Sequence, residues 1–518
     1  MFFNCITGKI IVFEHVEVIC EMDLTKNNKF NLVEILPFIF IVLFLGLLAV
    51  VLMKYPFLSV DEGFTRGFLN LNFADMVGLT ALDVHPPLYY FFPMAFVKIC
   101  HALSLNFNIT QLMKVPSIFP YLILVIFSLT KLRKEYGLVM AGIFSLALIA
   151  MSDFFMQYLT ARMYTWALLF LIISFFYVKD ILEKNDLKSW ILFTVFSVLG
   201  AYTHYFTGLS SVIIYLMLFL WILINRKDGS FIDRLKNFFI SVVVGFVLYL
   251  PWIFILFEQM KVVHDNYWVE PITAHNIISF CSYCFTFSNN QFIILMSFTL
   301  LVAIIVLLVR KYLETMDNDD LYLVMGVGVF VGTLVVGFIM SVVYKPILIS
   351  RYLLPSIGVL WLCLSIKLSR MNLKNSAILI IILLIAVVGA FNVYHEIQDI
   401  QKMNDYTIEE AKVLESINNN DSIIVYDTFN HYLRTHLDLD KVYEGYAGYS
   451  MNNATVTIPY ELDIVNEPFV IPDDLSKYPD KKVYFMVFYK SKADFPDGIQ
   501  AEKVGSAQHA TFYQIKSV

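Results

Sequence analysis

Acidic residues gather in one short segment of a chain that is otherwise poor in charge. The segment runs from residue 54 to residue 85, and its four acids are Asp61, Glu62, Asp75 and Asp83. A carboxylate beside a reacting hydroxyl can take its proton as a general base, an effect worth roughly 10²–10⁴ in rate. The segment is therefore the first candidate for catalysis. The alternative is that these acids are solvated loop charges without a chemical role.

The end of this segment reads Asp83-Val84-His85-Pro86-Pro87-Leu88-Tyr89-Tyr90. The two prolines fit the first turn of a helix, where a missing N–H costs little. The two tyrosines that follow are typical of a membrane–water interface. The pattern predicts that Asp83 and His85 lie at this boundary, directly before a helix whose positive end favours an anion.

Two arginines occur in a similar setting farther along the chain. Ala161-Arg162-Met163-Tyr164 opens an apolar stretch, and Ser350-Arg351-Tyr352 opens another. A guanidinium can hold a phosphate through two parallel hydrogen bonds. The alternative is that each arginine anchors its helix at the interface. Together with the acidic segment, the two arginines predict one pocket that combines a base with an anion-binding site.

The elements that position these residues are membrane helices. The chain has 518 residues, of which 58% are hydrophobic and only 15% charged, whereas soluble proteins carry roughly 25% charged residues. Four windows without Asp, Glu, Lys or Arg approach or exceed the roughly 20 residues that cross a bilayer: 35–53, 237–257, 321–344 and 375–394. We expect a polytopic α-helical membrane protein with about 11–13 transmembrane helices. The candidate spans are 35–53, 86–103, 115–131, 138–152, 162–178, 189–205, 208–225, 237–257, 290–309, 321–343, 350–366 and 375–394.

The basic residues of the short loops predict the orientation, because such loops are usually cytoplasmic. Lys131–Lys134 and four later clusters would be cytoplasmic, and the loop 54–85 would be external. Alternation through spans 86–103 and 115–131 instead places Lys131–Lys134 outside. One segment between 86 and 152 must therefore be short, re-entrant or wrongly assigned.

Three regions are predicted. Residues 1–34 form an N-terminal cytoplasmic segment, with Met22 as a plausible true start, and 35–394 form the membrane module. Residues 405–518 form a small external α/β domain, with strands predicted at 421–427, 482–489 and 510–515 and a helix at 429–437. From residue 395 onward there are 20 acidic and 11 basic residues. This balance argues against a nucleic-acid partner.

Taken in order, these motifs resemble the GT-C class of membrane glycosyltransferases. More narrowly, they resemble bacterial members of glycosyltransferase family 39, which is related to protein O-mannosyltransferases and aminoarabinose transferases. The resemblance covers about residues 35–370 and includes one further motif, Tyr202-Thr203-His204-Tyr205. It implies that a sugar is transferred at the external face of the cell membrane from a polyprenyl-phosphate donor to an acceptor. The acceptor would be a lipid, a glycan or a protein.

The resemblance also implies roles for individual residues. Asp61 would be the catalytic base, and Glu62 would help to place the acceptor. The other residues would contact substrate, with His85, Arg162 and Arg351 at the donor phosphate; the set is completed by Asp83, Tyr164, His204 and Tyr352. Attack from the side opposite the phosphate would invert the anomeric centre.

Several alternatives stay open. A multi-spanning transporter is one, although its ionisable residues would lie near mid-membrane, and a glycan ligase or polymerase is another. No cofactor is certain. A divalent metal is conceivable at His264 and His275, whose spacing fits no defined motif, and Cys281-x-x-Cys284 fits ordinary buried cysteines better than a metal or redox site.

Overall fold

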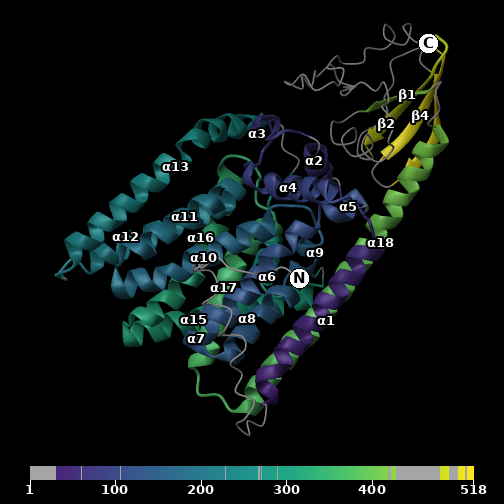
Figure 1. Ribbon diagram of the computed structural model, residues 1–518. Helices are drawn as coiled ribbons and strands as arrows, with labels where there is room; N and C mark the ends of the chain where they lie inside the picture. Colours follow the sequence, from purple (N-terminus) through teal and green to yellow (C-terminus); the bar gives the residue numbers. More distant parts are fainter. Residues whose placement is uncertain are drawn as a thin grey trace, which may run out of the picture.

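The computed structural model describes residues 31–59, 61–69, 71–105, 107–227, 229–265, 269, 271–288, 290–417, 422–426, 479–488, 500–507 and 510–517. These residues form a large helical body and a small sheet, joined by one long helix (Figure 1). Most of the predicted N-terminal segment, together with the predicted helix 429–437, lies outside the described residues.

Nine helical stretches among the described residues are long and apolar enough to cross a membrane. They are α1 (Leu32–Lys54), the run Ile109–Tyr136, α10 (Tyr164–Lys184), α12 (Tyr205–Ile224), α13 (Phe231–Asp265), α15 (Gln291–Thr315), α16 (Asn318–Val343), α17 (Leu354–Arg370) with the preceding turn η4 (Ser350–Leu353), and α18 (Asn375–Ile417). The run comprises α5 (Ile109–Leu112), η2 (Val115–Ser117), α6 (Phe119–Phe127), η3 (Ser128–Leu132) and α7 (Arg133–Tyr136). Two shorter apolar helices, α8 (Leu138–Ala150) and α11 (Leu187–Thr203), bring the total to the lower end of the predicted range. The predicted polytopic helical fold is confirmed.

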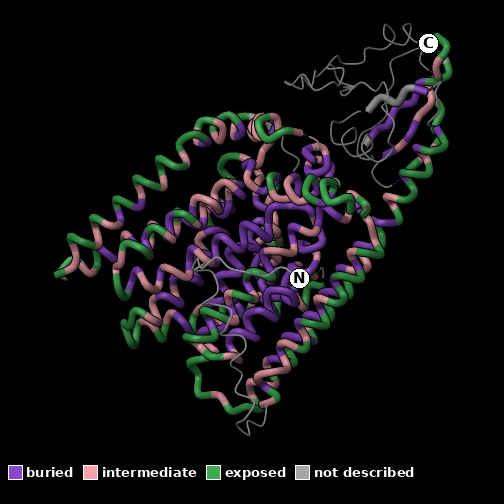
Figure 2. The backbone as a smooth tube through the Cα atoms, in the orientation of Figure 1, coloured by how far each residue is buried: buried purple, intermediate pink, exposed green. Residues whose placement is uncertain are grey.

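Helices α8, α10 and α17 form the centre of the body (Figure 2). Within its most apolar window α10 is 72% buried, whereas the window of α13 is only 11% buried. The outer helices keep apolar side chains exposed, as expected where the surroundings are lipid. Gly358 leaves room for side chains of α10: a Cβ there would lie 2.1 Å from Leu168 Cδ1 and 2.9 Å from Ile172 Cδ1, so a larger residue would force both buried side chains to move.

The predicted span 86–103 is wrong. The helix at this position, α4 (Leu88–Ala102), has 15 residues and is not among the membrane-crossing stretches. It is also absent from the shorter apolar helices, to which α8 and α11 belong, and its 15 residues include Lys98 and His101. It lies with α2 (Glu62–Phe68), α3 (Phe73–Leu82) and α5 at one end of the body, which we call the Asp61 face (Figure 1).

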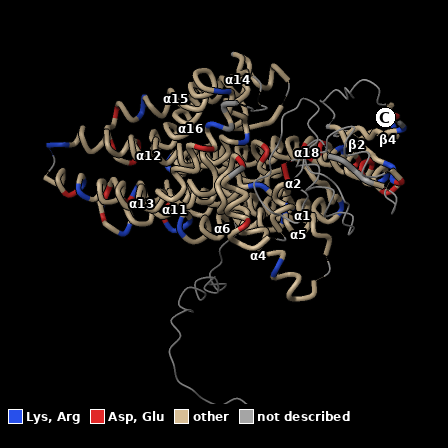
Figure 3. The backbone as a smooth tube through the Cα atoms, turned by 90° about the horizontal axis from the view of Figure 1, so that it is seen from above, with Lys and Arg blue, Asp and Glu red and all other residues tan. Residues whose placement is uncertain are grey.

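Removing this span restores the alternation of the chain. After α1 the chain stays on the Asp61 face until the run Ile109–Tyr136, so Lys131–Lys134 lie on the opposite face. Ion pairs join helix ends there: Lys179 pairs with Glu135 and Asp319, and Arg370 pairs with Asp319 at 2.9 Å. Figure 3 shows most of the body without charge, and charged residues at the tips of α12 and α13, around α2 and on the sheet.

Helix α18 runs without a break through the predicted boundary at 394–405. Its 43 residues leave the helical body and reach a four-stranded sheet. The strands are β1 (Ser422–Tyr426), β2 (Lys482–Phe488), β3 (Gln500–Ala507) and β4 (Ala510–Ser517), in the order β1-β2-β4-β3. Strand β1 is parallel to β2, and the other pairs are antiparallel. Three strands were predicted, and β3 was not.

The second half of α18 contacts the chain just before Asp61. Gln401 Nε2 donates to Tyr55 Oη at 2.7 Å, and the Leu58 N–H donates to Thr407 Oγ1 at 3.4 Å. These contacts place the start of the acidic segment beside α18. The sheet and the acidic segment therefore lie on the same side of the helical body (Figure 1).

Candidate active site

Asp61 lies at the N-terminus of α2 and faces the start of α17. Its Oδ2 accepts a hydrogen bond from Arg351 Nη2 at 2.5 Å, and both side chains keep about a third of their surface exposed, 34% and 31%. Burial raises the pKa of the Asp61 carboxyl, but the charges of Arg351 and Arg162 outweigh burial and hold the pKa below its ordinary value. Asp61 is therefore an ionised, partly accessible carboxylate.

Glu62, the next residue, is fully buried and is surrounded by protein. Its Oε1 accepts from the Ala161 N–H at 2.7 Å and its Oε2 from the Ser59 N–H at 2.9 Å. Lys114, also fully buried, lies 3.5 Å from Oε1 and donates to the Phe57 carbonyl. Glu62 thus joins the acidic segment to the loop that carries Arg162, and has no exposed surface for an acceptor.

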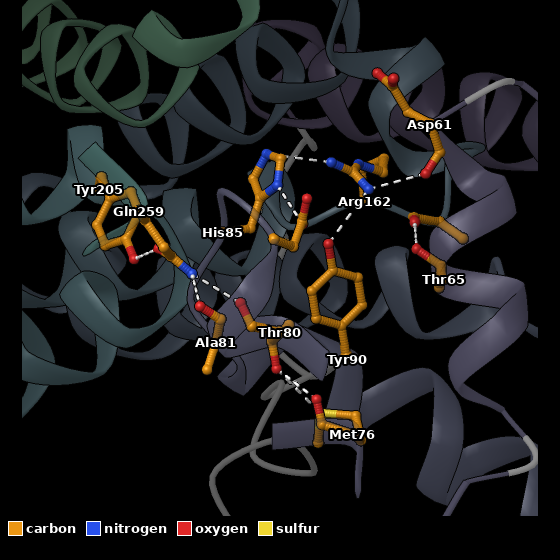
Figure 4. A network of polar contacts seen from close by, with 12 residues as sticks. Asp61, Thr65, Met76, Thr80, Ala81, His85, Tyr90, Arg162, Tyr205 and Gln259 are labelled. Atoms are coloured by element: carbon orange, nitrogen blue, oxygen red, sulfur yellow. Dashed lines mark hydrogen bonds and ion pairs between the residues drawn. The ribbon is translucent and has the colours of Figure 1, made fainter. Parts of the chain in front are cut away.

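Arg162 lies between Asp61 and His85 (Figure 4). Only 4% of it is exposed, and its hydrogen-bond acceptors are neutral: the Asp61 carbonyl at 2.9 Å, His85 Nε2 at 3.2 Å and Tyr90 Oη at 3.4 Å. Among the described residues no carboxylate lies within 4.0 Å of its guanidinium, and its Nε has no hydrogen-bond partner. A buried charge without a close counter-ion is costly unless a ligand compensates it.

His85 is held between Asp83 and Arg162. Arginine can only donate, so His85 Nε2 accepts from Arg162 and Nδ1–H donates to Asp83 Oδ2 at 2.9 Å. Burial lowers the pKa of His85, and Asp83 only partly offsets this. The imidazole is therefore neutral near pH 7. Asp83 and His85 orient Arg162 through this chain of contacts.

Three aromatic side chains from separate helices close the other side of this arrangement. The ring of His204 lies 4.7 Å from that of Tyr352 and 5.5 Å from that of Tyr164. His204 lies between α11 and α12, at the predicted turn. It is 2% exposed, and its Nδ1 has no hydrogen-bond partner among the described residues. Burial lowers its pKa well below the ordinary value. It offers a neutral imidazole nitrogen beside the two arginines.

A cavity of about 920 Å³ opens beside these rings. Its walls are almost wholly apolar and come from α11, α12 and α13, with His85, His204 and Tyr352 at its polar end. The outer wall, α13, is fixed to the acidic segment by Gln259, whose Nε2 donates to the Thr80 carbonyl at 2.7 Å (Figure 4). The cavity therefore suits a long apolar chain with a polar head at this end.

The nine predicted site residues thus lie in one connected region, although they come from five separate parts of the chain. Eight of them contact another residue of the set: Asp61 contacts Arg351, Asp83 contacts His85, His85 contacts Arg162, and His204 packs against Tyr164 and Tyr352. Glu62 differs, because it is buried behind Asp61. Among the described residues no group of three His, Cys, Asp or Glu side chains could hold a metal ion; the side chain of His264 is outside the described set, and His275 is exposed.

Similarity to known proteins is found in the structure but not in the sequence. No family model matches the sequence, and no curated protein matches it. ArnT from Cupriavidus metallidurans in the apo state superposes with a TM-score of 0.60 at 12% identity, over 92% of this chain and 97% of that one. The chain has the fold of ArnT. ArnT bound to undecaprenyl phosphate superposes over the same shares, with a TM-score of 0.58 at 13% identity. The predicted GT-C-like fold is therefore confirmed.

Two residues of this ArnT-like body were not predicted to matter. Lys114 is a single base in an apolar stretch, and that isolation was its only signal. Gln259 joins Thr80 to Tyr205, whose hydroxyl donates to Gln259 Oε1. The Lys114–Glu62 and Gln259–Thr80 contacts cannot be predicted from local spacing, because the partners are far apart in sequence.

Proposed function

We propose that this protein transfers a sugar from a polyprenyl-phosphate donor to the hydroxyl or amine of an acceptor. The observation that carries the proposal is Arg162, a buried cation without a close carboxylate, at the polar end of a large apolar cavity and in contact with the Asp61 backbone. The ArnT structure bound to undecaprenyl phosphate supports a lipid-phosphate ligand for this fold.

The donor would be bound at both of its ends. Its isoprenoid chain would lie in the cavity between α12 and α13, and burying that chain is favourable at roughly 25 cal/mol per Å². Its phosphate would meet Arg162 and Arg351, with His204 and the tyrosines around it. Two guanidinium groups in a partly dry site compensate phosphate charge more strongly than they would in water.

The chemical step uses Asp61 as the base. As the acceptor oxygen or nitrogen attacks the anomeric carbon, its proton passes to the Asp61 carboxylate. The bond from the anomeric carbon to the phosphate oxygen breaks, and its electron pair leaves with polyprenyl phosphate. Attack opposite the leaving group inverts the anomeric centre. Arg162 and Arg351 stabilise the charge that the leaving phosphate gains.

In this proposal Glu62 is a positioning residue. Its carboxylate and Lys114 fix Ala161, Ser59 and Phe57 around Asp61. Asp83 acts on Arg162 through His85 in the same way.

We further propose that the Asp61 face is external. The basic helix ends lie on the opposite face, which the positive-inside rule assigns to the cytoplasm. The C-terminal sheet would then be external as well, because α18 carries it to the Asp61 side.

The test is transfer by the protein reconstituted in vesicles, supplied with a panel of polyprenyl-phosphate sugars and membrane acceptors. Asp61→Asn should lower transfer at least 100-fold while undecaprenyl phosphate still binds, because the base is lost and the arginines remain. Asp75→Asn is the matched control, since Asp75 is a half-buried acid of the same segment whose side chain bonds to Asn72 and to none of the site residues.

Two results would contradict the proposal. Equal transfer by wild type and Asp61→Asn would remove Asp61 from the chemistry. No transfer from any lipid-phosphate sugar, together with solute uptake by the same vesicles, would favour a transporter.

A further inference from the structure

A further carboxylate, Asp153, lies on the Asp61 face, away from the apolar cavity. Asp153 directly precedes α9 (Phe154–Tyr158); its Oδ1 accepts from the Tyr283 hydroxyl and its Oδ2 from Gln157 Nε2 at 2.9 Å. Among the described residues it has no basic side chain within ion-pair distance. Its two partners are neutral, so its charge is not compensated by direct contact.

Gln157 adds an unused acceptor to this group. Because the Asp153 carboxylate only accepts hydrogen bonds, the amide NH₂ of Gln157 must face it. The carbonyl Oε1 of Gln157 is then not used in this contact. Gln157 is 6% exposed, and its Oε1 meets no donor in the described part of the chain. A buried carbonyl without a donor costs free energy that a hydrogen-bonding ligand can recover.

Neighbouring elements hold this group in place. Tyr283 follows α14 (Ala274–Ser282), and Glu396 reaches in from α18. Glu396 is 6% exposed, and its Oε2 accepts from the Met156 N–H of α9 at 2.6 Å. The surroundings of α9 are therefore rich in hydrogen-bond acceptors and carry the Asp153 carboxylate, which disfavours an approaching anion.

The position of α9 relates this group to the reaction centre. The chain passes from Asp153 through α9 to Ala161 and Arg162, which contact Glu62 and Asp61. Helices α11, α12 and α13, which line the cavity, lie on one side of the body, and α9 and α18 lie on the other (Figure 1). A donor in the cavity would occupy the side formed by α11, α12 and α13. The α9 side would then remain open to the acceptor.

We propose that Asp153 and Gln157 form the acceptor subsite and select an acceptor by its hydroxyl or amine hydrogens rather than by a phosphate. The inference rests on the proposed transferase function. Asp153 accepts from one or two donor groups of the ligand, and the free Gln157 carbonyl accepts from another. Tyr283 and Glu396 are positioning residues that fix the carboxylate and α9.

The test measures binding of three probes with the same tail to the full-length protein in nanodiscs loaded with undecaprenyl phosphate. The probes are octyl glucoside, octylamine and octyl phosphate, with empty nanodiscs subtracted. Wild type should bind the glucoside or the amine at least tenfold more tightly than the phosphate. Asp153→Asn should reduce that preference about tenfold, the effect of one charge-assisted hydrogen bond.

The control and a second variant separate the outcomes. Asp399→Asn, one turn after Glu396 and exposed, should keep the preference. If Asp153→Asn fails to fold, Gln157→Leu decides, because it removes the free carbonyl and should reduce the same preference. Undecaprenyl phosphate binding without any preference for the donor-rich probes would overturn the acceptor inference alone. Absence of undecaprenyl phosphate binding to wild type would overturn the proposed function instead.

Discussion

The buried ion pair between Glu62 and Lys114 gives a prediction whose size can be worked out from its contacts. Both side chains are fully buried, and Lys114 also donates to the Phe57 carbonyl and lies 3.1 Å from the centre of the Phe57 ring. Lys114→Met keeps most of the volume but leaves the Glu62 charge and the Phe57 carbonyl without this partner. Breaking a buried pair in this way costs about 3–5 kcal/mol.

The remaining contacts of Glu62 place the expected loss near the lower end of this range. Two backbone N–H groups, from Ser59 and Ala161, still stabilise the carboxylate. We expect Lys114→Met to lower the free energy of unfolding by about 3 kcal/mol. Glu62→Gln should cost a similar amount, because it leaves the Lys114 ammonium buried without its counter-charge.

The assay is reversible unfolding in mixed micelles for wild type, the two single variants and the double variant. The double variant should be at least 1 kcal/mol more stable than the sum of the single losses predicts, since removing both charges leaves neither unpaired. Lys184→Met is the control. Lys184 forms an exposed pair with Asp180 four residues earlier, so its loss should stay within about 0.5 kcal/mol. Additive losses, or a Lys114→Met protein as stable as wild type, would refute this account of the pair.

Three further variants test the proposed donor site and His204. Arg162→Lys should weaken undecaprenyl phosphate binding about tenfold, because one ammonium cannot reproduce the guanidinium contacts. The control Arg310→Lys changes an exposed ion pair and should leave this binding unchanged. Equal affinities of wild type and Arg162→Lys for undecaprenyl phosphate would contradict the role of Arg162. Gly245→Leu should weaken binding of undecaprenyl phosphate more than that of a ten-carbon prenyl phosphate, because Gly245 lines the cavity and a Cβ there meets no atom closer than 3.5 Å; an equal effect on both would place the chain elsewhere. His204→Phe should reduce the loss of stability as pH falls below about 6.5 by up to about 1.4 kcal/mol per pH unit, because buried His204 has a lowered pKa and only the unfolded chain takes up its proton in that range. An unchanged slope in unfolding experiments between pH 7.5 and 5.5 would contradict this.

The membrane helices were predictable because each must satisfy a length and a composition by itself. The segment 86–103 shows the limit of that reasoning. It is apolar, but Tyr89 and Tyr90 are fully buried against the protein, and Lys98 donates to the Leu71 carbonyl. Apolar side chains that pack on neighbouring helices look the same in sequence as those that face lipid.

The α18 helix shows a second limit. The change from apolar to polar residues near 395 suggests a boundary, yet Asn392, Glu396, Ile400 and Asn404 are buried at a spacing of four residues. That spacing continues one helical face through the change in composition. The sequence therefore predicts the strands of the C-terminal region better than its connection to the membrane module.

The candidate site was predictable as a set of residue types but not as a set of contacts. Asp61 and Arg351 are 290 residues apart, and the pair depends on the packing of α2 against the start of α17. Spacing within a motif indicates which side chains share a helix end. It carries no information on which helix ends meet, so Glu62 was expected to face an acceptor although it faces Lys114.

The charges at this centre account for the ion pair between Asp61 and Arg351. With His85 and His204 neutral, the carboxylates of Asp61 and Asp83 balance the guanidinium groups of Arg162 and Arg351. A donor phosphate would add negative charge and compete with Asp61 for Arg351. Because a nearby anion raises a carboxyl pKa, this competition would both free the Asp61 carboxylate and make it a stronger base. In the proposed reaction, Asp61 would therefore become a stronger base only after the donor has bound. The acceptor would lose its proton only when the donor is in place.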